Sequence, residues 1–153
     1  MSKDILRGLF IAMLVVGSSI SAGIVVAGPL DDGIAAYQNG DYGTALRLYR
    51  PLAEQGDARA QVRLGFMYEM GRGVPQDYWQ AGKWYRLAAE QGDAVAQNNL
   101  GSMYTDGQGV NQDYHEAVKW YRLGAEQGYA LAQASLGTMY SIGRGARKTT
   151  TKQ

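Results

Sequence analysis

The chain has 153 residues, enough for one compact domain or a short repeat array but not for two independent domains. It carries 15 basic and 14 acidic residues, and this net charge of +1 lacks the basic field that drives binding to a phosphate backbone. We therefore expect no nucleic-acid partner. The absence of cysteine excludes disulfides, thiolate metal sites and cysteine nucleophiles, and we expect neither a cofactor nor a metal.

Residues 1–27 are predicted to be a signal peptide. Lys3 and Arg7 form a short basic region, an uncharged and largely apolar stretch follows, and Ala27 supplies the small residue that signal peptidases prefer before the cut. The alternative is an uncleaved inner-membrane anchor, because about 20 uncharged residues are just long enough to span a bilayer. Glycine and serine dilute the second half of this stretch, so we expect cleavage. In both cases the remaining chain is expected to be exported. It would be periplasmic or secreted if the signal peptide is cleaved.

Beyond residue 40 the sequence repeats with a period of 36 residues. Five short motifs each occur three times in register, beginning in the first copy at Asp41, Tyr49, Ala53, Leu64 and Met67. Self-similarity at such a period is typical of helical repeat arrays, in which each repeat packs only on its neighbours.

Each period is predicted to hold two helices. One runs over about residues 77–91, with apolar residues on one face, Asp77 as its N-cap and Gly92 closing its C-terminus. The other runs over about residues 94–106 and ends at Gly107. In the first copy, we expect a proline inside the helix, Pro51, to kink the helix or to shorten its last turn.

Glycine recurs inside one helix of every copy, as Gly65, Gly101 and Gly137. A glycine in a helix interior costs about 1 kcal/mol relative to alanine, so a repeated one needs a reason. We expect close approach of two helix backbones, with small residues such as Ala81 and Ala89 opposite the glycine. The repeated Tyr, Trp and Met positions are expected to fill the core.

The repeated motifs resemble the Sel1-like repeat, a relative of the tetratricopeptide repeat with a longer loop between its helices. The resemblance rests on the strings AVAQNNLGSMYTDGQGV (94–110) and DYHEAVKWYRLGAEQG (113–128) and covers residues 41–145. It implies an all-α fold, an α-solenoid of antiparallel helix pairs that forms a right-handed superhelix.

With the family's phasing, residues 31–145 form the solenoid. Its predicted helix pairs are 31–55, 58–91 and 94–127, followed by an unpaired helix, 130–142. Residues 146–153 are predicted to be a disordered basic tail. Because repeat arrays normally carry a polar-faced terminal element, we expect the apolar side of the last helix to be covered by a partner, to form a homodimer with a second copy, or to be a weak point.

The resemblance implies that the first helix of each pair lines a concave groove. Within the copies, certain positions of these helices vary although the fold-forming positions do not. Asn98 and Asn99 could hydrogen-bond an extended peptide, and Arg59 and Arg63 could hold a carboxylate. The alternative is an ordinary solvated helix surface. The predicted partner-binding residues are Arg59, Arg63, Phe66, Asn98, Asn99, Ser102 and Thr138.

These observations predict a non-catalytic protein-interaction or adaptor module of the cell envelope that binds a protein or peptide. One alternative is an envelope hydrolase, because a cysteine-rich branch of the family is associated with β-lactam hydrolysis. This chain lacks cysteine, and its only histidine, His115, occupies a position held by Gly43 and Trp79 in the other copies. A Ser–Lys pair stays open at this point, but we expect no enzyme. The other alternative is self-assembly through the last helix.

Trp79 is expected to be exposed.

Overall fold

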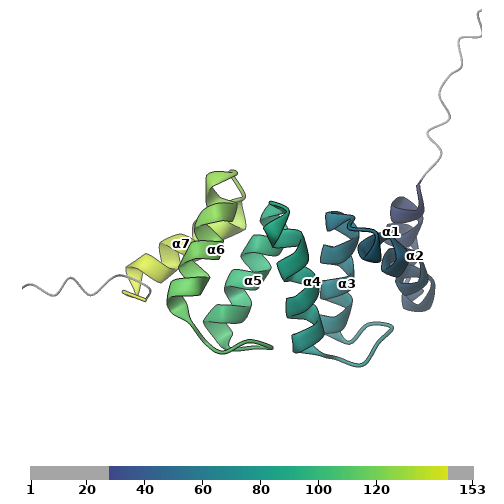
Figure 1. The fold of residues 1–153 in the computed structure, drawn as a ribbon, viewed down its shortest axis with the longest axis horizontal. Helices are drawn as coiled ribbons and strands as arrows, with labels where there is room; N and C mark the ends of the chain where they lie inside the picture. The colour runs from purple at the N-terminus through teal and green to yellow at the C-terminus, as the bar shows by residue number, and fades with distance from the viewer. Residues whose placement is uncertain (1–27, 145–153) are drawn as a thin grey trace, which may run out of the picture.

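The computed structural model describes residues 28–144, and in this range the chain forms seven α-helices and no strand (Figure 1). The predicted all-α solenoid is confirmed, whereas the predicted signal peptide and basic tail lie outside the described residues. The helices are α1 (Pro29–Gln38), α2 (Tyr42–Glu54), α3 (Ala58–Met70), α4 (Tyr78–Glu90), α5 (Ala94–Asp106), α6 (Tyr114–Glu126) and α7 (Ala130–Ser141). No helix in this range has the length and hydropathy of a membrane span.

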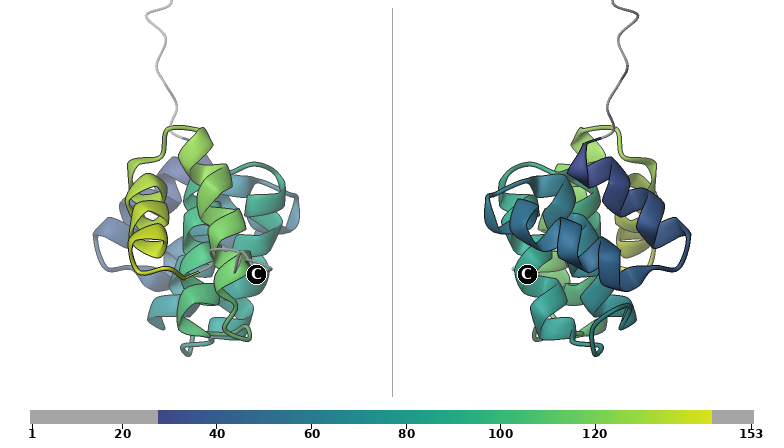
Figure 2. Two further views of the ribbon diagram at one scale, coloured as in Figure 1. Left: turned by 90° about the vertical axis from the view of Figure 1, so that its left-hand side faces the viewer. Right: turned by 90° about the vertical axis from the view of Figure 1, so that its right-hand side faces the viewer.

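The helices follow one another along the long axis of the molecule, from α1 and α2 at one end to α7 at the other (Figure 1). Each helix packs on its neighbours in the chain, and α5 also contacts α7. We call α1, α3, α5 and α7 the A helices and α2, α4 and α6 the B helices. Figure 2 shows the array from its two ends, with α7 in front in one view and α1 and α2 in front in the other.

Most helices begin at an aspartate whose side chain accepts a backbone N–H of the first turn. Asp77 accepts from the N–H of Gln80 at 3.0 Å, as expected of an N-cap. At α6, the N–H groups that bond to Asp113 lower the pKa of its carboxyl. Helix α7 differs, because its N-cap is Tyr129, which makes no side-chain cap hydrogen bond. The start of α7 therefore lacks the capping interaction that stabilises the other repeats.

Glycines in the left-handed conformation end the helices, as the sequence predicts. Gly107 is the C-cap of α5 with φ of 70°, and Gly92 follows the C-cap of α4 with φ of 94°. Pro51 does not shorten α2, which spans 13 residues, as α4 and α6 do. The predicted shortening was wrong, because Pro51 and Arg47, whose carbonyl loses its helical partner, both lie on the exposed surface, where water can bond to the carbonyl. The kink stays a prediction.

The repeated glycines make room for tyrosine rings rather than mainly for a neighbouring backbone. A Cβ on Gly65 would lie 2.8 Å from the ring of Tyr85, whereas the nearest backbone atom of α4, the Ala81 oxygen, lies 3.3 Å away. A Cβ on Gly101 would likewise lie 2.7 Å from the ring of Tyr121. The expectation is therefore corrected in one respect: Ala81 does lie close to Gly65, but an aromatic ring of the paired B helix fills the space that Gly65 and Gly101 leave.

The glycine of α7 has no such neighbour. Nothing lies within 4 Å of a Cβ placed on Gly137, and Leu136 and Met139 are the α7 side chains that pack on the α6 cluster. The same repeat position is thus filled by a ring in α3 and α5 and open in α7. This difference provides a matched pair of sites within one chain.

Buried glutamines join two of the A helices, α3 and α5, to the B helices before and after them. Gln97, only 4% exposed, donates from Nε2 to the Ala89 carbonyl at the end of α4. Its Oε1 accepts from Nε2 of Gln127 at 2.8 Å, at the end of α6. Gln61 makes the equivalent two contacts one repeat earlier. The repeated Gln of the motif therefore adds a second hydrogen bond to a terminal helix carbonyl, which also accepts the N–H of the glycine that follows the helix, and it links three consecutive helices.

Candidate functional site

The predicted binding residues lie on α3, α5 and α7, three of the A helices. On α3, Arg59 and Arg63 are exposed and four residues apart, so they share one face of the helix. Neither forms an ion pair with any residue between 28 and 144, where the one ion pair joins Lys119 to Glu116. Both guanidinium groups are therefore available to an anionic ligand.

Phe66 occupies a more enclosed place than its companions on α3. Its ring lies 6.2 Å from that of Tyr37 on α1, centroid to centroid, and it packs against the core cluster of α4 and α5. The side chain is half-buried. Phe66 therefore contributes to helix packing, and only part of its ring is open to a partner.

Asn98 and Asn99, both half-buried, form a polar group on α5 with Ser135 of α7. Nδ2 of Asn98 donates to Oδ1 of Asn99, and the Ser135 hydroxyl donates to Oδ1 of Asn98, each at 3.4 Å. These distances lie at the long end for hydrogen bonds, so both contacts are weak. A peptide backbone could replace them at little cost. Ser135 was left out of the predicted set, although it shares its repeat position with Arg63 and Asn99.

The remaining predicted residues are not brought into that group. Ser102 is half-buried on α5, and Thr138 is exposed on α7 with its hydroxyl donating to the Ala134 carbonyl at 3.0 Å. No hydrogen bond between described residues joins either side chain to Asn98 or Asn99. The structure thus assembles one polar cluster and leaves the other residues spread along the A helices.

Tyr85, a tyrosine of the core, has the most strongly shifted pKa among the described residues. Burial, and then the neighbouring charge of Glu69, raise the pKa of Tyr85 far above its usual range, and its hydroxyl donates to the Glu69 carboxylate. A tyrosine with a raised pKa remains protonated and acts as a hydrogen-bond donor, not as a base. Its place between paired helices marks it as a packing residue.

Two of the three serines within residues 28–144 bond to other protein groups. The Ser135 hydroxyl donates to Asn98 and the Ser141 hydroxyl to the Thr138 carbonyl. His115 is exposed on the first turn of α6. No group of three or more metal-ligating side chains occurs in this part of the chain.

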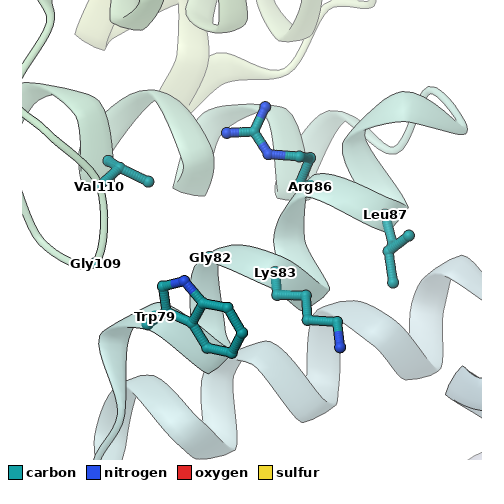
Figure 3. Close-up of a pocket in the computed structure, with 7 residues that line it drawn as sticks. All are labelled: Trp79, Gly82, Lys83, Arg86, Leu87, Gly109 and Val110. Carbon is teal, nitrogen blue, oxygen red and sulfur yellow. The ribbon is translucent and has the colours of Figure 1, made fainter.

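A cavity that sequence reasoning did not identify lies on α4. Its volume is about 290 Å³, and its walls come from α4 and from the loop between α5 and α6 (Figure 3). The only signal in the sequence is Trp79, an aromatic residue at a position that varies between the copies. The lining residues are Trp79, Gly82, Lys83, Arg86, Leu87, Gly109 and Val110.

Comparison with known proteins shows what this arrangement is similar to. A family model described as Sel1 repeat matches four consecutive segments, 31–57, 58–93, 94–129 and 130–148. Comparison with curated proteins gave no match.

Two solved structures have closely similar folds. One is a protective antigen with an SLR fold, present in uropathogenic Escherichia coli strains (TM-score 0.74, 45% identity, covering 77% of this chain and 26% of that one). The other is a Sel1 repeat protein from Oxalobacter formigenes (TM-score 0.74, 39% identity, 78% and 49%). The chain therefore spans about a quarter and about half of the lengths of these two proteins.

Proposed function

We propose that this chain, which belongs to the Sel1 repeat family, is a non-catalytic adaptor that binds a partner protein or peptide along its A helices. Sel1 repeats generally mediate protein–protein interaction, and Sel1 repeat proteins are generally non-catalytic scaffolds. A quasi-linear array offers an extended surface to a ligand, which suits a peptide better than a small substrate. The partner would be met in the cell envelope, because the N-terminal sequence resembles an export signal.

The observation that carries this proposal is the polar cluster of Asn98, Asn99 and Ser135. Its hydrogen bonds are long, its side chains are half-buried, and it lies where α5 contacts α7. Amide side chains can both donate to and accept from the backbone of an extended peptide. The unpaired guanidinium groups of Arg59 and Arg63 would bind a carboxylate of the same partner further along the array.

Replacing Asn98 and Asn99 together by alanine is expected to reduce partner recovery about tenfold in pull-downs from the envelope fraction. The physical reason is the loss of the two amides that would pair with the partner backbone. The measurement is quantitative mass spectrometry of proteins retained by the wild-type and variant chains.

Gln55→Ala is the control, because it removes a side-chain amide that is exposed and lies at the end of α2, away from the polar cluster. It is expected to retain the partner fully. Equal recovery by the wild type and the Asn98/Asn99 variant, with circular dichroism showing both folded, would reject the proposal.

A second candidate function, self-association through α7, is favoured by the open side of that helix. No atom lies within 4 Å of a Cβ placed on Gly137. Leu131 (59% exposed) and Ile142 are among the exposed large hydrophobic residues. In α3 and α5 a tyrosine of the following B helix covers the position equivalent to Gly137, whereas the residues equivalent to Leu131 and Ile142 are exposed there too. A second copy could bury these side chains in an interface.

Light scattering over a concentration series tests this candidate. The wild type is expected to show a mass that rises from monomer to dimer, and replacement of Leu131 and Ile142 by serine is expected to keep the chain monomeric. Leu123→Ser, an exposed leucine on α6, is the control and should dimerise like the wild type. A wild-type chain that stays monomeric throughout would exclude self-association.

A further inference from the structure

We propose that the cavity on α4 binds an acidic segment of a partner protein, in which a bulky apolar side chain lies next to a carboxylate. This site lies on a B helix and an inter-helix loop, apart from the A-helix surface. It is therefore a second binding site, and its existence does not depend on the first.

The apolar part of the cavity is formed by Trp79, Leu87 and Val110. Trp79 is 62% exposed, which is unusual for a residue of this size and is typical of side chains that contribute strongly to protein interfaces. Figure 3 shows Trp79 and Val110 near Gly82 on the α4 wall. Met103 of α5 fills the space that a Gly82 side chain would take, with its Cε 3.2 Å from a Cβ placed there, so Gly82 is part of the cavity floor. A ligand side chain lying over this floor would contact the Trp79 indole and the aliphatic groups of Val110 and Leu87.

The loop wall is held firmly against α4. A Cβ on Gly109 would lie 2.2 Å from the carbonyl oxygen of Tyr78, and the glycine has φ of 68°. Only a residue without a side chain can approach the helix so closely in this conformation. The cavity is therefore formed before a ligand arrives, which reduces the entropy cost of binding.

Two uncompensated cations lie at this cavity. Lys83 is exposed, Arg86 is half-buried, no lining residue is acidic, and neither cation has an ion-pair partner among residues 28–144. The equivalent of Lys83 in the next repeat, Lys119, does pair with Glu116, whose own equivalent on α4 is Gln80. The first repeat also has two unpaired cations at these positions, Arg47 and Arg50. The second repeat therefore differs from the third in its unpaired Lys83, and from the first in Trp79, which stands where the first repeat has Gly43.

Arg86 is also held in place by a contact that recurs in the other repeats, where Arg50 and Arg122 donate to Tyr68 and Tyr140. Its Nη2 donates to the Tyr104 hydroxyl at 2.6 Å, and its guanidinium lies 5.7 Å from the centre of that ring. These contacts orient the guanidinium, and no carboxylate takes part in them. The remaining N–H groups can bond to a carboxylate, the strongest type of partner for arginine.

The openness of the cavity favours a peptide segment over a free small molecule. Pockets for small ligands usually bury most of the ligand. At about 290 Å³, with Trp79 largely exposed, this cavity holds one bulky side chain and leaves the flanking groups on the surface. A peptide has such flanking groups, and Lys83 and Arg86 lie where its acidic residues would extend.

The experiment is a selection of random seven-residue displayed peptides on the immobilised full chain. We expect enrichment of peptides with an aromatic or leucine side chain beside Asp or Glu, and loss of at least about tenfold in affinity for the resynthesised peptide with Trp79→Ala or Lys83→Glu. Changing the peptide's acids to amides should weaken binding similarly. Trp79 and Lys83 are exposed, so both variants should fold, which circular dichroism checks.

Each other outcome overturns the proposal. These outcomes are no enrichment, full binding to the Trp79→Ala chain, or equal affinity for the amide peptide. If the free acid 3-phenylpropionate binds as tightly as the peptide, the site is a small-molecule pocket and not a docking site. Loss of the selected peptide with Asn98→Ala and Asn99→Ala, but not with Trp79→Ala, would assign the binding to the A-helix surface and so separates the two sites.

Discussion

Gly101→Leu is expected to lower the free energy of unfolding by about 3 kcal/mol or more, a large share of the stability of a domain of this size. The new Cβ alone would lie 2.7 Å from the buried ring of Tyr121. The ring cannot move aside, because it packs in the cluster that joins α6 to α7. Urea unfolding followed by far-UV circular dichroism measures the change.

Gly137→Leu is the matched control, at the same repeat position one copy later. No atom lies within 4 Å of its new Cβ, and leucine is a better helix former, so the variant should gain up to about 1 kcal/mol. The opposite signs of the two changes are the critical result. In combination with Tyr121→Ala, Gly101→Leu should cost much less than it does alone. Equal costs in both backgrounds would show that the glycine does not accommodate the ring.

Gln97→Leu is expected to cost about 2–3 kcal/mol, despite placing an apolar residue at a buried site. Leucine can neither donate to the Ala89 carbonyl nor accept from Nε2 of Gln127, so two hydrogen bonds of the buried Gln97 side chain are lost. The Ala89 carbonyl keeps the Gly92 N–H, and Gln127 keeps a longer bond to the Leu123 carbonyl, but water cannot replace the lost bonds at this buried site. The shift of the urea midpoint measures this loss, provided that the slope of the unfolding free energy against urea concentration is unchanged.

Gln133→Leu provides the comparison for that result. Gln133 is exposed on α7 and bonds to the Ala125 carbonyl at 3.2 Å, where water can replace it. The change should therefore be within about 0.5 kcal/mol of neutral. If Gln97→Leu proves as mild as Gln133→Leu, the buried glutamines do not hold the repeats together.

Much of the fold follows from the repeated sequence itself. Each copy confirms the helix signals of the others, so Asp77 as an N-cap and Gly107 as a C-cap are predicted correctly. The contacts between helices were harder to predict. Periodicity shows which face of a helix points inward, but it does not show which side chain of the neighbouring helix packs against that face. A tyrosine 20 residues after Gly65 and again after Gly101 was the available signal for the true packing.

The candidate sites were predicted less completely than the fold. Variation between copies marks positions free of folding constraints, and Asn98 and Asn99 were found in this way. The same comparison cannot show that Phe66 packs on Tyr37, since that contact crosses from one A helix to another. The α4 cavity was missed because its wall depends on how closely Gly109 approaches Tyr78, a distance that only the three-dimensional structure reveals.

The contacts between helices also bear on how such an array can change in evolution. Each glycine–tyrosine and glutamine–glutamine contact lies within a repeat or between adjacent repeats, and no core residue depends on a distant one. Duplication of one 36-residue unit would therefore regenerate the same contacts at the new junction without changes elsewhere. A gene can thus lengthen its binding surface by whole units, while a single position such as Trp79 diverges to recognise something new.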